Sequence, residues 1–156
     1  MRMTIFGVFI LALVFTFDNA LGEKYRIFSP GFFKISWEQA RRNCQNIGIG
    51  WDLVKIESRA EDQIIKDMLK CETGRGDGWF IGGISRNGKW TYPDGSRMIY
   101  TAFGIKGRDT QSIAARKQFI GDVINYAAIF KSDLAWDYLT QHDNNIMGYV
   151  CEAWYC

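Results

Sequence analysis

The pattern of apolar positions over residues 79–96 predicts a buried β-hairpin near the middle of the chain. Two apolar segments of strand-like composition flank the pair Asn87-Gly88. Asn-Gly supplies the positive φ angles that a two-residue hairpin turn requires. Glycine weakens the interior of a strand, so Gly82 and Gly83 indicate a β-bulge or the close approach of another backbone.

Two amphipathic helices are predicted before this hairpin. Ser36 with Gln39, and Ser58 with Glu61, have the spacing of a capping box, in which a serine and a residue three positions later satisfy each other's backbone N–H groups. The apolar residues after each serine recur with a helical period. The expected inward-facing residues are Trp37, Ala40, Cys44 and Ile47 in the first helix, and Ile64, Ile65, Met68 and Leu69 in the second.

Short apolar segments elsewhere in the chain predict β-strands. They are residues 25–28, 32–35, 52–56, 126–130, 134–136 and 149–152. Residues 97–122 follow no sustained period, so they are interpreted as a long irregular loop, with a short helix over 111–119 as the alternative. Strands, then two helices, then strands make this an α+β domain.

The first 22 residues have the composition of a secretory signal peptide. Arg2 precedes an apolar run over residues 5–17, and the small residues Ala20 and Gly22 follow. This run is too short to span a bilayer, and no later segment is apolar for long enough to do so. We therefore expect cleavage after Gly22 and a soluble, extracellular domain over residues 23–156, without a membrane anchor.

Composition narrows the class of protein further. A chain of 156 residues with 47% hydrophobic residues can bury one sizeable core. Its net charge of +2 argues against strong binding to nucleic acid or to a membrane surface. The second candidate class, a secreted hydrolase, needs an activated nucleophile or paired carboxylates, and no such constellation is evident. A third, a structural protein that binds ice or mineral, would need a regular polar face.

The four cysteines predict two disulfides in an exported protein. They are Cys44, Cys71, Cys151 and Cys156, and four cysteines allow three pairings. Their spacing lacks Cys-x-x-Cys motifs, and His142 is the only histidine, so a structural zinc site is not expected.

Taken in order, several short motifs resemble the C-type lectin-like domain. They are Trp37-Glu38-Gln39-Ala40 with Cys44, Leu53-Val54-Lys55-Ile56 with Ser58 and Glu61, Phe80-Ile81-Gly82-Gly83, Trp90, Asp94-Gly95-Ser96, Trp136 and Tyr149-Val150-Cys151-Glu152. The resemblance implies an α+β fold with two helices, antiparallel sheets and a long irregular loop. It also implies a disulfide between Cys44 and Cys151. We then expect Cys71 to pair with Cys156 within a monomer, with a disulfide-linked dimer through either cysteine as the alternative.

The resemblance breaks down at the family's calcium-dependent sugar site. That site uses a Glu-Pro-Asn or Gln-Pro-Asp triplet in the long loop and an Asn-Asp pair after a tryptophan, because calcium requires six to eight oxygen ligands. Here no proline follows Ser96, and Trp136 precedes Asp137-Tyr138. We therefore expect no cofactor and no standard calcium site. An atypical calcium site is left open, with these candidate ligands: Asp109, Asp122 and Asp137.

The favoured function is noncatalytic recognition of a glycan, with an extracellular protein as the alternative ligand. Candidate contact residues are Lys106, Arg108, Asp109, Asp137, Tyr138, Asn144 and Asn145. Because Lys106 and Arg108 are positively charged, anionic sugars are favoured over neutral ones. The tripeptide Arg75-Gly76-Asp77 is a second candidate, for integrin-type adhesion, although Gly-Asp-Gly is also ordinary turn chemistry.

Overall fold

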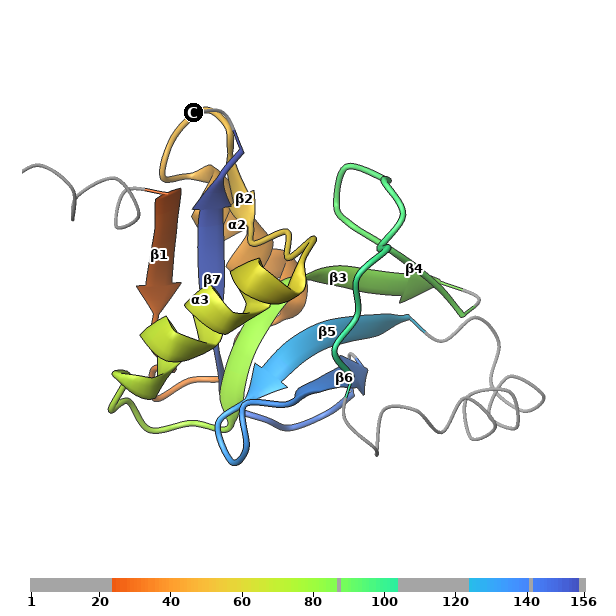
Figure 1. Ribbon diagram of the computed structural model, residues 1–156. Helices are drawn as coiled ribbons and strands as arrows, with labels where there is room; N and C mark the ends of the chain where they lie inside the picture. The colour runs from red at the N-terminus through yellow and green to blue at the C-terminus, as the bar shows by residue number, and fades with distance from the viewer. Residues whose placement is uncertain (1–23, 87, 104–123, 141, 155–156) are drawn as a thin grey trace, which may run out of the picture.

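The computed structural model describes residues 24–86, 88–103, 124–140 and 142–154. Within these ranges two helices and seven strands follow one another along the chain (Figure 1). They are β1 (Tyr25–Phe28), α2 (Trp37–Gln45), β2 (Trp51–Leu53), α3 (Arg59–Lys70), β3 (Gly78–Arg86), β4 (Lys89–Thr91), β5 (Asn125–Phe130), β6 (Trp136–Thr140) and β7 (Met147–Ala153). Neither described helix is long and apolar enough to cross a membrane.

The strands form one mixed sheet in the order β1-β7-β3-β5-β6, with β2 also paired to β7 and β4 to β3. Every pairing is antiparallel except that of β3 with β7, where Phe80 lies opposite Tyr149 in parallel register. The expectation of antiparallel pairing therefore fails at this one place. The last strand lies between β1 and β3, and it brings the end of the domain back beside its beginning.

Each helix covers one face of the sheet (Figure 1). Successive residues of a strand point to opposite faces, so Trp79 and Ile81 pack with Ile65 of α3, whereas Phe80 packs with Trp37 of α2. The result is two apolar layers separated by the strands. Residues that alternate along β3, β5 and β7 divide between these layers.

Capping explains where the two helices begin. At α2 the predicted capping box is present: the Gln39 N–H donates to Ser36 Oγ at 3.1 Å, and the Ser36 N–H donates to Gln39 Oε1 at 2.9 Å. At α3 only half of the predicted box forms. The Glu61 N–H donates to Ser58 Oγ at 3.2 Å, but Glu61 accepts from the Glu57 N–H at 2.9 Å and from the Tyr25 hydroxyl at 2.6 Å.

The central hairpin forms as predicted. Arg86 pairs with Lys89, which leaves a two-residue turn in which Gly88 has φ of 75°. Gly82 shows both features that were expected there, the close approach of another backbone and an irregularity in strand pairing. Its N–H donates to Val54 O at 2.9 Å, a Cβ there would lie 2.7 Å from the same oxygen, and the register of β3 on β5 shifts between Phe80 and Ile84.

Three strand predictions need correction. Residues 32–35 are not a strand. Phe32 and Phe33 are 86% and 84% exposed, so these apolar side chains lie on the surface and not in a sheet. The strand expected at 52–56 is β2 and ends at Leu53. The strand expected at 134–136 begins only at Trp136, because Leu134 adopts φ of 54° in a turn.

Several predictions fall on residues whose structure is not described. These are the signal peptide over 1–22, the possible helix over 111–119, and most of the long loop. The part of that loop that is described, residues 97–103, is irregular apart from isolated bridges at Arg97 and Phe103.

The predicted disulfide between Cys44 and Cys151 is present. It joins α2 to β7 across 107 residues, with the two Cα atoms 5.4 Å apart. Cys71 is exposed and unpaired within the described residues, and Cys156 lies outside them. The pairing of Cys71 with Cys156 therefore stays a prediction.

Candidate functional site

A buried carboxylate fixes the start of β6, the strand that carries two of the predicted contact residues. The Trp136 indole N–H donates to Asp62 Oδ1 at 2.8 Å, and the Tyr100 hydroxyl donates to Asp62 Oδ2 at 3.1 Å. Lys66 Nζ lies 2.8 Å from the same oxygen. Burial and the Asp62 carboxylate together raise the pKa of Tyr100, so this hydroxyl stays a donor. Helix α3 thus anchors both Trp136 and the described part of the long loop.

Aromatic contacts place the described end of that segment against β6. The Phe103 ring lies edge-on to Trp136, with centroids 5.7 Å apart, and tilted against Trp90 at 4.8 Å. Phe103 also forms an isolated bridge with Trp136. The chain therefore enters the long loop directly beside the first residue of β6.

Strand β6 places two of the predicted contact residues, Asp137 and Tyr138, on opposite faces of the sheet. Asp137 lies opposite Ala128 on β5, and Tyr138 lies opposite Ala127. Since Ala128 belongs to the layer beneath α2 and Ala127 to the layer beneath α3, Asp137 and Tyr138 project from opposite faces. Both are half-buried, and Asp137 Oδ1 accepts a hydrogen bond from the Tyr138 N–H at 2.8 Å.

Asn144 and Asn145 lie in the connection from β6 to β7. This connection is held by Asp143, whose Oδ2 accepts from Thr140 Oγ1 at 3.1 Å, and by Lys34, whose ammonium donates to the Asp143 carbonyl. Lys34 Nζ also lies 3.4 Å from Asn144 Oδ1. Asn145 lines an open cavity of about 400 Å³. The structure thus places Asn144 beside Lys34, shortly before α2, and Asn145 in the same cavity lining as Asp77.

Asp77, the acidic member of the predicted adhesion tripeptide, has a structural role. Its Oδ2 accepts from the Ile146 N–H at 2.7 Å, and its own N–H donates to Ile146 O at 2.8 Å. Gly76 adopts φ of +146°, and a Cβ there would lie 2.3 Å from Pro30 Cβ. These contacts explain Gly76 and Asp77 without any partner. Arg75 is exposed, and the adhesion role stays a prediction.

The remaining predicted contact residues, Lys106, Arg108 and Asp109, lie outside the described residues, as does Asp122. Within the described ranges, no three or more His, Cys, Asp or Glu side chains gather in an arrangement that could hold a metal ion. Of the three candidate ligands for an atypical calcium site, only Asp137 has a described position.

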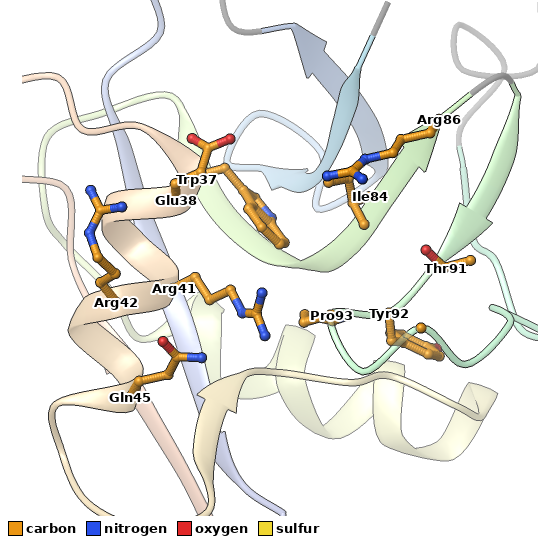
Figure 2. A pocket seen from close by; sticks show the side chains of 11 residues that line it. Trp37, Glu38, Arg41, Arg42, Gln45, Ile84, Arg86, Thr91, Tyr92 and Pro93 are labelled. Carbon is orange, nitrogen blue, oxygen red and sulfur yellow. The ribbon is translucent and has the colours of Figure 1, made fainter.

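A cavity that sequence reasoning missed lies between α2 and the β3–β4 hairpin (Figure 2). We call it the hairpin cavity. Its volume is about 400 Å³, and it is lined by Trp37, Glu38, Arg41, Arg42, Gln45, Ile84, Arg86, Thr91, Tyr92, Pro93 and Gly95. The sequence signal was the Arg41-Arg42 pair on a predicted helix and Arg86 before the predicted turn. Nothing in the sequence placed these residues together.

The charged groups of the hairpin cavity differ in how far they are already paired. Arg41 donates through Nε and Nη2 to Asp52 at 3.1 Å. The Glu38 carboxylate accepts from the Tyr126 hydroxyl. Burial alone would raise the pKa of Glu38, but this hydrogen bond and the nearby Arg42 charge hold it below its ordinary value. Glu38 is therefore ionised at neutral pH.

Comparison with known proteins identifies the fold. The sequence model of the lectin C-type domain matches residues 33–153. Human lithostathine superposes with a TM-score of 0.64 at 19% identity, covering 84% of this chain and 91% of that one. The lectin CEL-I from Cucumaria echinata gives 0.60 at 20% identity, covering 81% and 86%. The complex of SPL-1 with GlcNAc gives 0.62 at 17% identity, covering 82% and 85%.

A search among curated proteins found no match. At identities this low the solved structures establish the fold alone, and the family match rests on the sequence itself. That match spans most of the chain and includes both helices, the Cys44–Cys151 disulfide and the strands from β2 to β7. The chain belongs to the C-type lectin domain family.

Proposed function

We propose that this protein is an exported, noncatalytic recognition module that binds a carbohydrate without the standard calcium site of its family. The binding surface would be formed by β6 and the long loop. The observation that carries the proposal is the arrangement at the start of β6, where Asp137 supplies one carboxylate and Tyr138 projects from the opposite face. Calcium needs six to eight oxygen ligands, and this strand offers few of them.

Support for a sugar ligand comes from the family and from the structural relatives, which include SPL-1 in complex with GlcNAc. The chemistry of the loop favours an anionic sugar, because Lys106 and Arg108 attract sulfate or carboxylate groups and repel a divalent cation. Export follows from the predicted signal peptide. N-terminal sequencing of the product secreted by a eukaryotic cell should begin at residue 23, and a product retained in the cell would contradict export.

A glycan array tests the ligand and the calcium independence together. The purified protein should bind sulfated or uronic-acid glycans equally well with calcium and with EDTA. Replacing both loop cations, as Lys106→Gln with Arg108→Gln, should weaken this binding about tenfold. The matched control removes two positive charges from α3, as Arg59→Gln with Lys70→Gln, and should bind as the wild type does. Sugar binding that disappears in EDTA and returns with calcium would refute the proposal and favour an atypical site at Asp109, Asp122 and Asp137.

The alternative, a module that binds an extracellular protein, is supported by an exposed aromatic pair. Phe32 and Phe33 are adjacent and almost fully exposed before α2. Aromatic residues exposed in this way are typical of protein interfaces. If no glycan on the array is bound, binding to extracellular proteins that Phe32→Ser with Phe33→Ser abolishes would support this function instead.

A further inference from the structure

We propose that the hairpin cavity is a second binding site, which takes an acidic sugar unit of a sulfated or uronic-acid glycan. This inference goes beyond the proposed function, because no residue that lines the cavity belongs to β6 or the long loop. It rests on charge, on the pairing state of each arginine, and on the apolar floor between them.

The lining residues carry an excess of positive charge. Three arginines, Arg41, Arg42 and Arg86, and one carboxylate, that of Glu38, are among the lining residues, and Asp52 lies against Arg41. Glu38 already accepts a hydrogen bond from the Tyr126 hydroxyl, and Arg42 lies close enough to lower its pKa. Because Asp52 pairs with Arg41 and Glu38 lies near Arg42, the positive charge left over to attract an anion is that of Arg86.

Arg41 and Arg86 are the groups that would hold this anion. Figure 2 shows their guanidinium groups reaching into the space between α2 and the hairpin from opposite sides, whereas Arg42 points away. Arg86 makes no ion pair within the described residues. Asp52 occupies Nε and Nη2 of Arg41 and fixes its orientation, so Nη1 is left for a ligand. Guanidinium groups bind sulfate and carboxylate through paired, charge-assisted hydrogen bonds.

The floor of the cavity favours a sugar ring over a small free anion. Ile84 and Pro93 supply apolar surface between the two arginines, and the Trp37 side chain lies beside them. A volume of about 400 Å³ falls within the range of about 300–1,000 Å³ that is usual for small-molecule sites. A sugar ring can lay its C–H face on this floor and direct an acidic substituent to an arginine. An inorganic sulfate would use the charge and leave the apolar surface uncovered.

Calorimetric titration with a size-defined heparin hexasaccharide tests the proposal on the intact protein. Arg86→Gln should weaken binding about tenfold, since Arg86 is exposed at the end of β3 and its loss leaves no buried group unpaired. Arg41→Lys keeps a charge for Asp52 but loses the planar fork, and should weaken binding by a smaller factor. The matched control, Arg59→Gln, removes one charge from the opposite face of the sheet and should leave the affinity unchanged.

Further ligands and variants separate this site from the loop site and from simple attraction between charges. The desulfated hexasaccharide should bind much more weakly, and a polyaspartate peptide of equal charge should compete poorly. The proposal is overturned if Arg86→Gln binds as tightly as the wild type, if Arg59→Gln loses as much affinity as Arg86→Gln, or if polyaspartate competes fully. If the loop variants Lys106→Gln and Arg108→Gln lose affinity while Arg86→Gln does not, the proposed function stands and the second site fails.

Discussion

Helix α2 is joined to the sheet covalently, through Cys44 and Cys151, whereas α3 is joined to the opposite face by the buried Asp62 carboxylate. On the α3 side both oxygens of that carboxylate are engaged, Oδ1 by Trp136 and Oδ2 by Tyr100 and Lys66. On the α2 side Arg86 projects into a cavity without an ion pair in the described part of the chain. The Asp62 carboxylate is paired within the fold, whereas the Arg86 guanidinium is not.

Strong polar contacts alone therefore do not locate a binding site. Asp62 is the more buried group, and both of its oxygens already hold partners within the fold. It holds Trp136 and Tyr100 in place on the α3 side of the sheet. Buried carboxylates with complete partner sets are costly to disturb, whereas exposed guanidinium groups can change partners at little cost.

The largest expected effect is that of removing the covalent link on the α2 side. Replacing Cys44 and Cys151 together by alanine should lower the free energy of unfolding by about 4–5 kcal/mol, because the disulfide closes a separation of 107 residues in the unfolded chain. Urea unfolding of the wild type and the variant measures it. Cys71→Ala tests the other predicted disulfide: a loss of several kcal/mol is expected if Cys71 pairs with Cys156, and a change of less than about 0.5 kcal/mol would contradict that pairing.

A smaller loss is expected when the anchor on the α3 side is removed. Asp62→Ala leaves the Trp136 indole N–H and the Tyr100 hydroxyl without their acceptor, and should cost about 3 kcal/mol. The control is Asp67→Ala on the same helix, which removes only exposed side-chain contacts with Lys70 and Gln63 and should cost much less than Asp62→Ala. Thermal unfolding followed by tryptophan fluorescence compares the two. Equal losses would mean that the buried cluster does not anchor β6.

The smallest effect concerns pH and the α2 side. Because the folded-state pKa of Glu38 is below its ordinary value, its ionised form contributes stability that is present above the unfolded-state pKa and is lost as pH falls through the folded-state pKa. The side chain is exposed, so the contribution is at most about 0.5 kcal/mol. In urea unfolding between about pH 2 and pH 6, Glu38→Gln should reduce the rise in stability with pH. An unchanged rise would show that the contact with Tyr126 adds nothing.

Much of the fold could be predicted because its signals are local. The Ser36 capping box acts within one helical turn, and the Asn87-Gly88 turn joins two adjacent strands. The apolar residues of this segment also predicted a buried hairpin, and β3 is buried along most of its length. Where local signals misled, the cause was tertiary. Phe32 and Phe33 have strand-like character but find no neighbouring strand, and Glu61 turns from its expected partner toward Glu57 and Tyr25.

The sequence by itself determined the two helices, the central hairpin and the family, because these depend on residue types at short spacings or on motifs in a fixed order. Only the tertiary structure decided which polar groups meet. Asp62 and Trp136 are 74 residues apart, and Arg41 and Arg86 approach one cavity from a helix and a strand. Such meetings depend on the pairing of distant strands and on which face each residue takes. Neither strand pairing nor the face that a residue takes can be read from an apolar period or a short motif, because these two features arise from contacts across the whole domain.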